Sequence, residues 1–327
     1  MTKRIIYLHV GPHKTGTTVL QKACLDNRNI LEAQGIKYPN LFFNHIGHHK
    51  LVDIIRRKEI TADVLAKVKS LNSDVIFSSE NFISLNKDNW QYFFSSFADY
   101  QVKIIYSWRR SSQKMYSLWQ ESIKQGGVKN FTDFYYKELI RPGQSALLCP
   151  HIQLDKWSNF VGKANIKILD YDASKSSNSL IADFFNLLSI ESSLINTEKI
   201  SSGIKNKSLP PEVVEILRCL NRIYSSSNNS SSYVREQFFK YSERVNEDVD
   251  NISNTMSNFC ETLTVGDYFV DKISERKLLE DYKNNIVNYK ENRHQSSVKI
   301  ISPDWNLDSK SNDTLHRVYQ KLGLKEV

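Results

Sequence analysis

The chain has 327 residues, of which 40% are hydrophobic and 24% are charged, an ordinary composition for a globular protein. Its mean hydropathy of −0.46, together with the lack of an apolar run of about 18 residues, argues against a membrane span. The formal charge of +8 favours an anionic partner, which could be nucleic acid, a phosphorylated small molecule or an acidic surface.

The N-terminal half of the chain alternates short apolar strands with helical stretches. The pattern predicts strands at 5–10, 74–77, 102–108 and 166–171, and helices at 17–33, 49–71 and 179–188, with a further long helix that ends at 122. Strands that alternate with helices form βαβ units, so we expect an α/β fold with a central parallel sheet flanked by helices. Ligands of such sheets collect beyond the carboxyl ends of the strands.

The C-terminal third has a different pattern, because the strand signal fades after about residue 205. Helices are expected at 210–223, 233–249 and 275–291. The serine-rich tract 225–232 is interpreted as a loop within the domain, with a domain boundary as the alternative. We therefore predict a single domain over 1–327, with an α/β core at about 1–208 and a helical C-terminal elaboration at about 209–327.

The most informative stretch is IIYLHVGPHKTGTTVLQ at 5–21, which reads as a strand, a glycine-punctuated loop and a helix. Such a loop can direct several backbone N–H groups at one anion, and the helix dipole adds partial positive charge. The anion-binding features are Gly11 and Gly16 for close approach, Lys14 for charge, and the hydroxyls of Thr15, Thr17 and Thr18. The alternative is a plain turn between strand and helix that carries a lysine.

The spacing of this loop differs from the nucleotide-triphosphatase pattern G-x-x-x-x-G-K-[ST]. In that pattern a lysine directly follows the second glycine, and a Ser or Thr hydroxyl binds Mg²⁺. Here Thr17 follows Gly16, and the lysine comes earlier, at Lys14. A Rossmann G-x-G-x-x-G is absent as well. The loop therefore fits a phosphate or sulfate group without an obligatory metal.

At these residues the chain resembles the sulfotransferases that use 3′-phosphoadenosine 5′-phosphosulfate (PAPS), especially bacterial carbohydrate-type members. GPHKTGTT followed by Leu-Gln is similar to their 5′-phosphosulfate loop. The resemblance implies a P-loop-like sheet, a Lys14 that stabilises the departing phosphate, and a backbone at 15–18 that holds the 5′-phosphate. Gly11 and His13 complete the expected donor-binding loop, although His13 could instead hydrogen-bond the loop itself.

A second motif fits the 3′-phosphate site of this family, where an arginine at a strand end precedes a serine by eight positions. Arg109 and Ser117 have that spacing. A guanidinium offers a planar fork to phosphate oxygens. Two turns of helix would bring the serine hydroxyl to the same oxygens. The alternative for Arg109-Arg110 is a solvated basic pair.

The third element of the family, an R-K-G-like loop, has no clear counterpart. The segment 202–208 lies at a plausible position and could supply Lys205 or Lys207, with a solvated loop as the alternative. The resemblance covers about residues 4–210 well and the remainder only loosely.

Sulfuryl transfer to an alcohol needs a base within hydrogen-bond reach of the hydroxyl. The first candidate is Glu80, which follows a predicted strand at the ligand edge of the sheet; the alternative there is a helix cap at Ser79. The second candidate is His48, from the cluster His45, His48 and His49. A metal is less favoured for that cluster, because no carboxylate or cysteine lies at ligand spacing. The sequence leaves Glu80 and His48 open.

The predicted acceptor is a hydroxyl of a carbohydrate or glycoconjugate. Aromatic side chains suit sugar stacking, but the candidates are equally well explained as core residues: Trp90, Trp108, Trp119, Tyr135 and Tyr136. Two other functions compete with sulfotransfer. A P-loop-like kinase would need Mg²⁺ and ATP, and a nucleic-acid binder would need basic residues on one face, whereas the basic residues here are scattered among acidic runs such as 243–250.

The compartment is expected to be the cytoplasm. Cys24, Cys149, Cys219 and Cys260 lie far apart and form no C-x-x-C pair, which favours reduced thiols over a disulfide framework or a zinc site. The chain passes from Met1-Thr2-Lys3-Arg4 straight into a strand-like stretch, so we expect no secretory signal. The expected partners are the nucleotide donor and a sugar acceptor, and the oligomeric state is not predicted.

Overall fold

A computed structural model of the chain describes residues 3–196, 209–224, 232–287, 289 and 296–324. The chain divides into two compact units, each of which is taken by itself below. The first unit comprises Met1–Arg110, Gly143–Lys205 and Ile273–Arg293. The second comprises Ser111–Pro142, Asn206–Lys272 and His294–Val327. The two units interleave along the chain. The sequence instead places one boundary, near residue 208, between the α/β core and the helical C-terminal part of a single domain. The single domain therefore stays a prediction.

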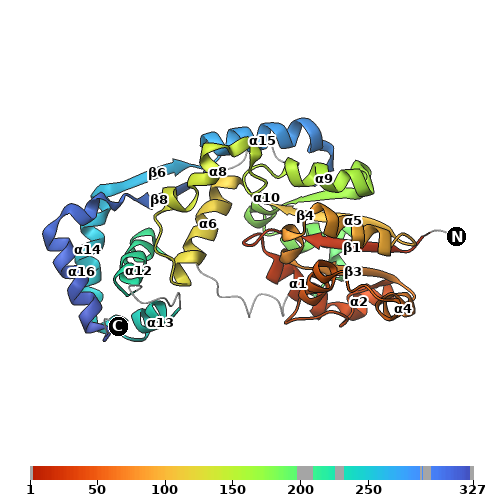
Figure 1. Ribbon diagram of the computed structural model, residues 1–327, viewed down its shortest axis with the longest axis horizontal. Helices are drawn as coiled ribbons and strands as arrows, with labels where there is room; N and C mark the ends of the chain where they lie inside the picture. The colour runs from red at the N-terminus through yellow and green to blue at the C-terminus, as the bar shows by residue number, and fades with distance from the viewer. Residues whose placement is uncertain (1–2, 197–208, 225–231, 288, 290–295, 325–327) are drawn as a thin grey trace. The chain divides into compact units, whose positions relative to one another are not determined.

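The first unit is built on a parallel sheet whose strand order is β2-β3-β1-β4-β5-β7 (Figure 1). Its strands are β1 (Ile5–Val10), β2 (Ile36–Lys37), β3 (Asp74–Ser78), β4 (Gln101–Trp108), β5 (Ile166–Asp170) and β7 (Ile286–Val287). At the centre, Leu8 of β1 pairs with Phe77 on one side and with Ile104 on the other. These central strands are mostly apolar and mostly buried because helices cover both faces of the sheet.

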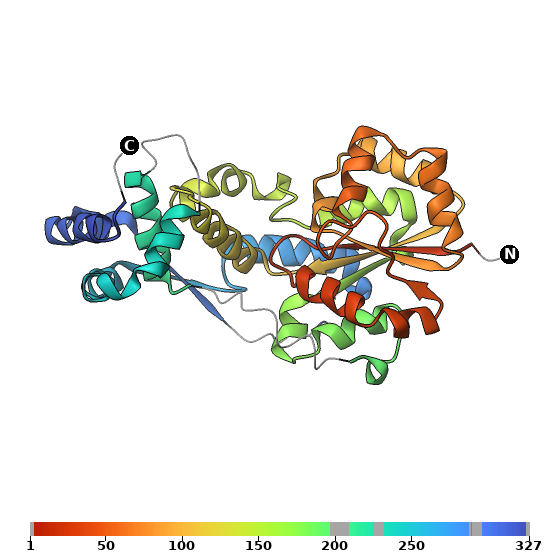
Figure 2. The same ribbon diagram turned by 90° about the horizontal axis from the view of Figure 1, so that it is seen from below.

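Helices cover both faces of the sheet of the first unit (Figure 2), and one hydrophobic cluster on each face joins the sheet to them. One face packs against α3 (His49–Arg57), α4 (Ala62–Ser70), α5 (Lys87–Ser96), α9 (His151–Val161) and the C-terminal part of α15 (Phe269–Tyr282). The other face packs against α1 (Thr17–Asp26), α2 (Arg28–Ala33) and α11 (Leu180–Leu187). The short α10 (Tyr171–Ser176) follows β5 directly. This layered arrangement confirms the predicted α/β fold with a central parallel sheet flanked by helices.

Some boundaries in the first unit differ from the prediction. The helix expected over 17–33 is two helices that meet at Asn27, and the one expected over 49–71 is interrupted after Lys58, which has a left-handed φ of 58°. The sequence pattern also misses β2 and β7, because a strand of two residues is too short to show a period.

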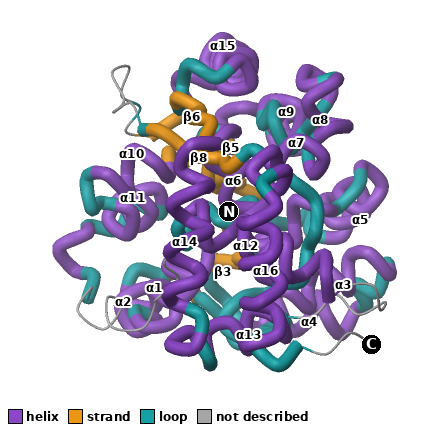
Figure 3. Tube along the Cα trace, turned by 90° about the vertical axis from the view of Figure 1, so that its left-hand side faces the viewer, coloured by secondary structure: helices purple, strands orange, loops and turns teal. Residues whose placement is uncertain are grey.

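The second unit is mainly helical in its described part, as predicted. Its helices are α6 (Ser111–Lys124), α7 (Phe131–Phe134), α8 (Tyr136–Ile140), α12 (Pro211–Tyr224), α13 (Tyr233–Lys240), α14 (Asn246–Met256) and α16 (Ser309–Lys321). It also contains an antiparallel ladder of β6 (Cys260–Thr264) and β8 (Ser297–Ile301), visible in Figure 3. The sequence does not predict this ladder, because polar residues interrupt the apolar ones in both strands, at Glu261 and Thr262 in β6 and at Lys299 in β8. None of the helices in the described residues is long and apolar enough to cross a membrane.

Candidate active site

The sheet order itself marks the ligand-binding edge of the first unit. β1 lies between β3 and β4, so the chain moves to one side of β1 for β2 and β3 and to the other side for β4 and β5. In open parallel sheets, ligands bind at the carboxyl ends of the strands where the order reverses in this way. The segments that follow β1, β3 and β4 contain the glycine loop, Glu80 and Arg109, respectively.

The glycine loop between β1 and α1 has an unusual backbone. Lys14 adopts a left-handed φ of 70° and Gly16 one of 76°. For a residue other than glycine this region costs about 1–2 kcal/mol, so the conformation of Lys14 must be held by its surroundings. At Gly11, a Cβ would come within 2.3 Å of the Thr17 side chain, so the loop closes only around a glycine there.

The end of this loop offers unpartnered backbone donors. Gly16 is the N-cap residue of α1 and provides no side-chain cap, and the first amide that bonds back to it is that of Leu20. Among the described residues, none accepts a hydrogen bond from the amides of Gly16, Thr17 or Thr18. These donors therefore point to an anion at the N-terminus of the helix.

The three threonines of the loop are not equivalent. The Thr15 hydroxyl is buried and donates to the carbonyl of Pro12 at 2.7 Å, so it closes the loop rather than facing a ligand. Thr17 is almost fully buried, whereas Thr18 is exposed. The hydroxyl expected from Thr15 is therefore used within the loop, and of the three threonines only Thr18 is exposed.

Arg109, directly after β4, contacts the glycine loop. Its Nη1 donates to the carbonyl of Lys14 at 2.9 Å, and its Nε lies 3.4 Å from Oδ1 of Asp172. The side chain of Arg110 contacts a different residue, because its Nε donates to Oε1 of Glu275 at 2.5 Å. The two arginine side chains are 16% and 11% exposed, so they do not form the solvated pair considered above.

Ser117, the predicted partner of Arg109, lies within α6, which begins directly after Arg109-Arg110. The expected helix after the strand is therefore present. Because α6 belongs to the second unit, the distance between Ser117 and Arg109 is not described, and their pairing stays a prediction. Lys205 and Lys207 lie outside the described residues.

Glu80 lies after β3 in a polar cluster formed by three segments. Its Oε2 accepts a hydrogen bond from Nε2 of Gln21 at 3.3 Å and lies 4.0 Å from Nε2 of His49. Its Oε1 lies 4.0 Å from Nδ1 of His13 in the glycine loop. The Ser79 hydroxyl caps the short turn that follows by accepting from the Asn81 amide, so the carboxylate of Glu80 is not used for capping.

His49 is held in place by a second contact. Its Nδ1 lies 2.8 Å from the hydroxyl of Ser79. Gly47 leaves room for this arrangement, because a Cβ there would lie 2.8 Å from both Gln21 Nε2 and His49 Nε2. Glu80 is thus surrounded by hydrogen-bonding groups and remains 19% exposed, enough to meet a substrate.

His48 is placed differently from Glu80. It is fully buried; its Nδ1 accepts from the Ser78 amide at 3.1 Å, and its Nε2 donates to the Pro39 carbonyl at 3.0 Å. Burial lowers the pKa of His48 to about 3, against the opposing effect of these backbone hydrogen bonds. With both ring nitrogens bonded to backbone, His48 has no nitrogen to offer a hydroxyl. This geometry speaks against His48 as the base.

A further histidine, His9 on β1, ties together the strand ends beneath the site. Its Nδ1 lies 2.7 Å from the Ser78 hydroxyl of β3, and its Nε2 lies 3.1 Å from the Ser107 hydroxyl of β4. The ring is fully buried, and burial lowers the pKa of His9 to about 3. One neutral imidazole therefore connects the three strands that carry the loop, Glu80 and Arg109.

Several residues of this site have no signal in the sequence. His9 reads as one position of a strand and Asp172 as an ordinary polar residue of a helix, and Gln21 ends the loop motif without any sign that it contacts Glu80. These residues reach the site only because the strands that precede or contain them are neighbours in the sheet. A weak signal exists for His49, which stands beside His48 in the cluster that the sequence singles out.

The aromatic residues considered for sugar stacking are mostly core. Trp90 and Trp108 are buried in the first unit, and Trp119 and Tyr135 are buried in the second. Tyr136 is the exception, with 61% of its surface exposed. The described residues contain no group of three or more His, Cys, Asp and Glu side chains arranged to hold a metal ion.

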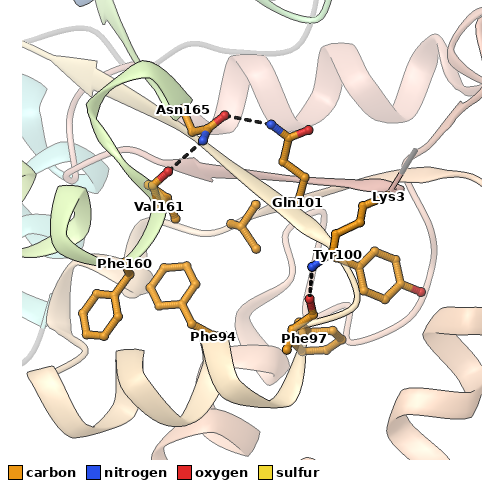
Figure 4. Close-up of a pocket in the computed structure, with 10 residues that line it drawn as sticks. Lys3, Phe94, Phe97, Tyr100, Gln101, Phe160, Val161 and Asn165 are labelled. Carbon is orange, nitrogen blue, oxygen red and sulfur yellow. Dashed lines mark hydrogen bonds between the residues drawn. The ribbon is translucent and has the colours of Figure 1, made fainter. Parts of the chain in front are cut away.

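A cavity of about 490 Å³ lies at the opposite, amino edge of the sheet (Figure 4). Phe94 and Phe160 stack within it at a centroid distance of 4.8 Å. Its remaining lining comes from residues at the beginnings of strands and the ends of helices: Lys3, Phe97, Ala98, Tyr100, Gln101, Val102, Val161 and Asn165. It contains none of the candidate site residues.

Comparisons with known proteins give one finding. No family model matches the chain, and no curated protein matches it. Among solved structures, a sulfotransferase from Alicyclobacillus acidocaldarius aligns with 70% of this chain and 98% of its own, at 14% identity and a TM-score of 0.38. A likeness at this TM-score indicates no function for this chain by itself.

Proposed function

We propose that the protein is a sulfotransferase that transfers the sulfuryl group of PAPS to a hydroxyl of a carbohydrate or glycoconjugate. The observation that carries the proposal is the set of amides at Gly16, Thr17 and Thr18, which have no acceptor among the described residues and begin two positions after Lys14. Such donors at a helix N-terminus suit a phosphate group. The resemblance of the loop sequence to the 5′-phosphosulfate loop then selects PAPS among phosphate-bearing ligands.

The residues of the site have distinct roles in this proposal. The amides of the loop hold the 5′-phosphate, and the Lys14 ammonium stabilises the negative charge that develops on the leaving phosphate oxygen. Arg109, with Ser117, binds the 3′-phosphate through its planar guanidinium. The loop departs from the nucleotide-triphosphatase pattern, in which a lysine directly after the second glycine is followed by the hydroxyl that binds Mg²⁺, so the proposed reaction uses no obligatory metal.

Glu80 is the proposed general base. The acceptor hydroxyl attacks sulfur in line with the leaving oxygen; a new O–S bond forms as the bond from sulfur to the phosphate oxygen breaks. The hydroxyl proton passes to Glu80, and adenosine 3′,5′-bisphosphate leaves. Gln21 orients the carboxylate through its hydrogen bond of 3.3 Å, and His49 lies close enough to stabilise it.

A transfer assay with radiolabelled PAPS tests this function. The wild-type protein is expected to move the label to at least one member of a panel of mono- and oligosaccharides. Lys14→Ala should reduce kcat/KM by on the order of 100- to 1,000-fold, because it removes charge stabilisation of the leaving group. Lys50→Ala, at an exposed lysine on α3, is the matched control and should keep the wild-type rate.

Two results would contradict the proposal. Transfer by Lys14→Ala at the wild-type rate would remove the assigned role of Lys14. Transfer of phosphate from ATP–Mg²⁺, with none of sulfate from PAPS, would assign the protein to the kinases instead.

A further inference from the structure

The guanidinium of Arg109 is bound on several sides within the first unit. Its Nη1 donates to the Lys14 carbonyl at 2.9 Å, and its Nε lies 3.4 Å from Oδ1 of Asp172. Its central carbon lies 5.3 Å from the centre of the Tyr171 ring. Among the described residues, none accepts a hydrogen bond from Nη2. One side chain thus contacts the glycine loop while it keeps donors for a ligand.

The contact with Lys14 matters because of the backbone there. Lys14 has a φ of 70°, a region that residues other than glycine avoid. The hydrogen bond from Arg109 fixes the peptide that follows this φ. Tyr171 closes the same loop from another side, since a Cβ on Gly16 would lie 2.8 Å from its ring. Arg109 and Tyr171 therefore hold the loop between Pro12 and Thr17 in its anion-binding conformation.

Asp172 in turn holds Arg109. Its Oδ1 faces the Arg109 Nε, and its Oδ2 accepts from the Arg110 amide at 2.9 Å. Asp172 is itself fixed in the first turn of α10, which Asp170 caps by accepting from the Ala173 amide at 3.1 Å. Its side chain is 17% exposed, so solvent screens this ion pair only in part.

We propose that Asp172 and Arg109 position the Lys14 loop, so that the arginine assigned to the 3′-phosphate also sets the affinity for the 5′-phosphate. The nucleotide part of this inference rests on the proposed function; the loop part does not. A 3′-phosphate that binds Nη2 fixes the guanidinium in the orientation that supports Lys14. The two phosphates of one donor nucleotide therefore bind cooperatively, which favours a bisphosphate over a nucleotide with a single 5′-phosphate.

The loop part is tested without any ligand, by limited trypsin digestion followed by mass spectrometry of cleavage after Lys14. Cleavage at a native loop follows the population of its open form. Arg109→Gln should raise the cleavage rate at Lys14 by about tenfold, the effect of losing one charge-assisted hydrogen bond. Asp172→Asn keeps an acceptor for the Arg110 amide and should raise the rate in the same direction.

Arg110→Gln is the matched control, because its side chain bonds Glu275 and not the loop. Its cleavage rate at Lys14 should stay within about twofold of the wild-type rate. If Arg109→Gln also stays within that range, Arg109 does not position the loop and the proposal is wrong. Arg109→Lys, which retains a positive charge and a donor, provides a milder variant should Arg109→Gln fold poorly, and it should cleave at an intermediate rate.

The nucleotide part is tested by calorimetric titration with adenosine 5′-monophosphate and adenosine 3′,5′-bisphosphate. Arg109→Gln and Asp172→Asn are expected to weaken binding of the monophosphate by about fivefold to tenfold, although it has no 3′-phosphate. Unchanged monophosphate binding beside weakened bisphosphate binding would limit Arg109 to the 3′-phosphate and overturn the coupling. Failure of the wild-type protein to bind either nucleotide would instead overturn the proposed function, with the digestion result unaffected.

Discussion

At the scale of single residues, the candidate site depends on how neighbours constrain a few polar groups. Glu80 and His48 are both plausible bases in the sequence, and their surroundings separate them. Glu80 remains partly exposed and accepts one hydrogen bond from Gln21, whereas His48 is fully buried and uses both ring nitrogens on backbone groups. The base role in our account therefore belongs to Glu80.

Glu80→Gln tests this assignment. The amide keeps the shape of the side chain but cannot take a proton, so kcat for sulfuryl transfer should fall by on the order of 100- to 10,000-fold. Binding of adenosine 3′,5′-bisphosphate should stay close to the wild-type value. Glu32→Gln, at an exposed position of α2, serves as the control. A Glu80→Gln enzyme with wild-type kcat would exclude Glu80 as the base.

Gly16→Ala tests the geometry of the loop. Gly16 and Gly162 have φ values of 76° and 77°, but a Cβ on Gly16 would lie 2.8 Å from Tyr171, whereas one on Gly162 would meet nothing within 4 Å. Alanine should reduce the free energy of unfolding at both positions, by about 1–2 kcal/mol at Gly16, where ψ is 12°, and by about 1–3 kcal/mol at Gly162, where ψ is 146° and the backbone region is almost exclusive to glycine. In nucleotide titrations, only Gly16→Ala should also weaken binding of the bisphosphate. Equal nucleotide affinities for the two variants would contradict the described loop.

At the scale of strands and helices, the elements that can be predicted are those in which many neighbouring residues are apolar. β1, β3, β4 and β5 are rich in apolar residues because both of their faces are largely buried, and the sequence predicts each of them within a few residues. The paired strands β6 and β8 escape prediction because Glu261, Thr262 and Lys299 interrupt any apolar run. His9 shows the same limit, since its link to Ser78 and Ser107 depends on which strands are neighbours.

The buried histidines predict an acid-sensitive first unit. Folding lowers the pKa of His9 and His48 from 6.5 to about 3, so the unfolded chain binds more protons between these values. The free energy of unfolding should therefore be at its full value above about pH 6.5 and decrease below it, by about 1.4 kcal/mol per pH unit for each histidine.

Urea unfolding at about pH 7 and about pH 5 measures this dependence. His9→Asn, which cannot titrate in this range, should make the pH dependence less steep than that of the wild-type protein. His316→Asn is the control for loss of an exposed histidine. A His9→Asn protein with the wild-type pH dependence would show that His9 does not resist protonation in the folded state.

At the scale of the whole molecule, the net charge of +8 says less about the ligand than the positions of individual basic residues do. Lys14 and Arg109 follow central strands and reach one edge of the sheet, which the sequence predicts from the order of strands and loops. The division of the chain into two interleaved units is not predictable in the same way. Segments 111–142 and 273–293 each belong to a different unit from the stretches of chain on either side of them.

The proposed ligand of the glycine loop and Arg109 is a nucleotide with phosphates at its 3′ and 5′ positions. Thermal unfolding of the full chain, measured with adenosine 3′,5′-bisphosphate and separately with ATP–Mg²⁺, tests whether the protein binds such a nucleotide. At about 100 times its dissociation constant, the bisphosphate should stabilise the protein by about 2.7 kcal/mol, and ATP–Mg²⁺ should give a smaller effect. No stabilisation by the bisphosphate, beside a clear one by ATP–Mg²⁺, would contradict the account.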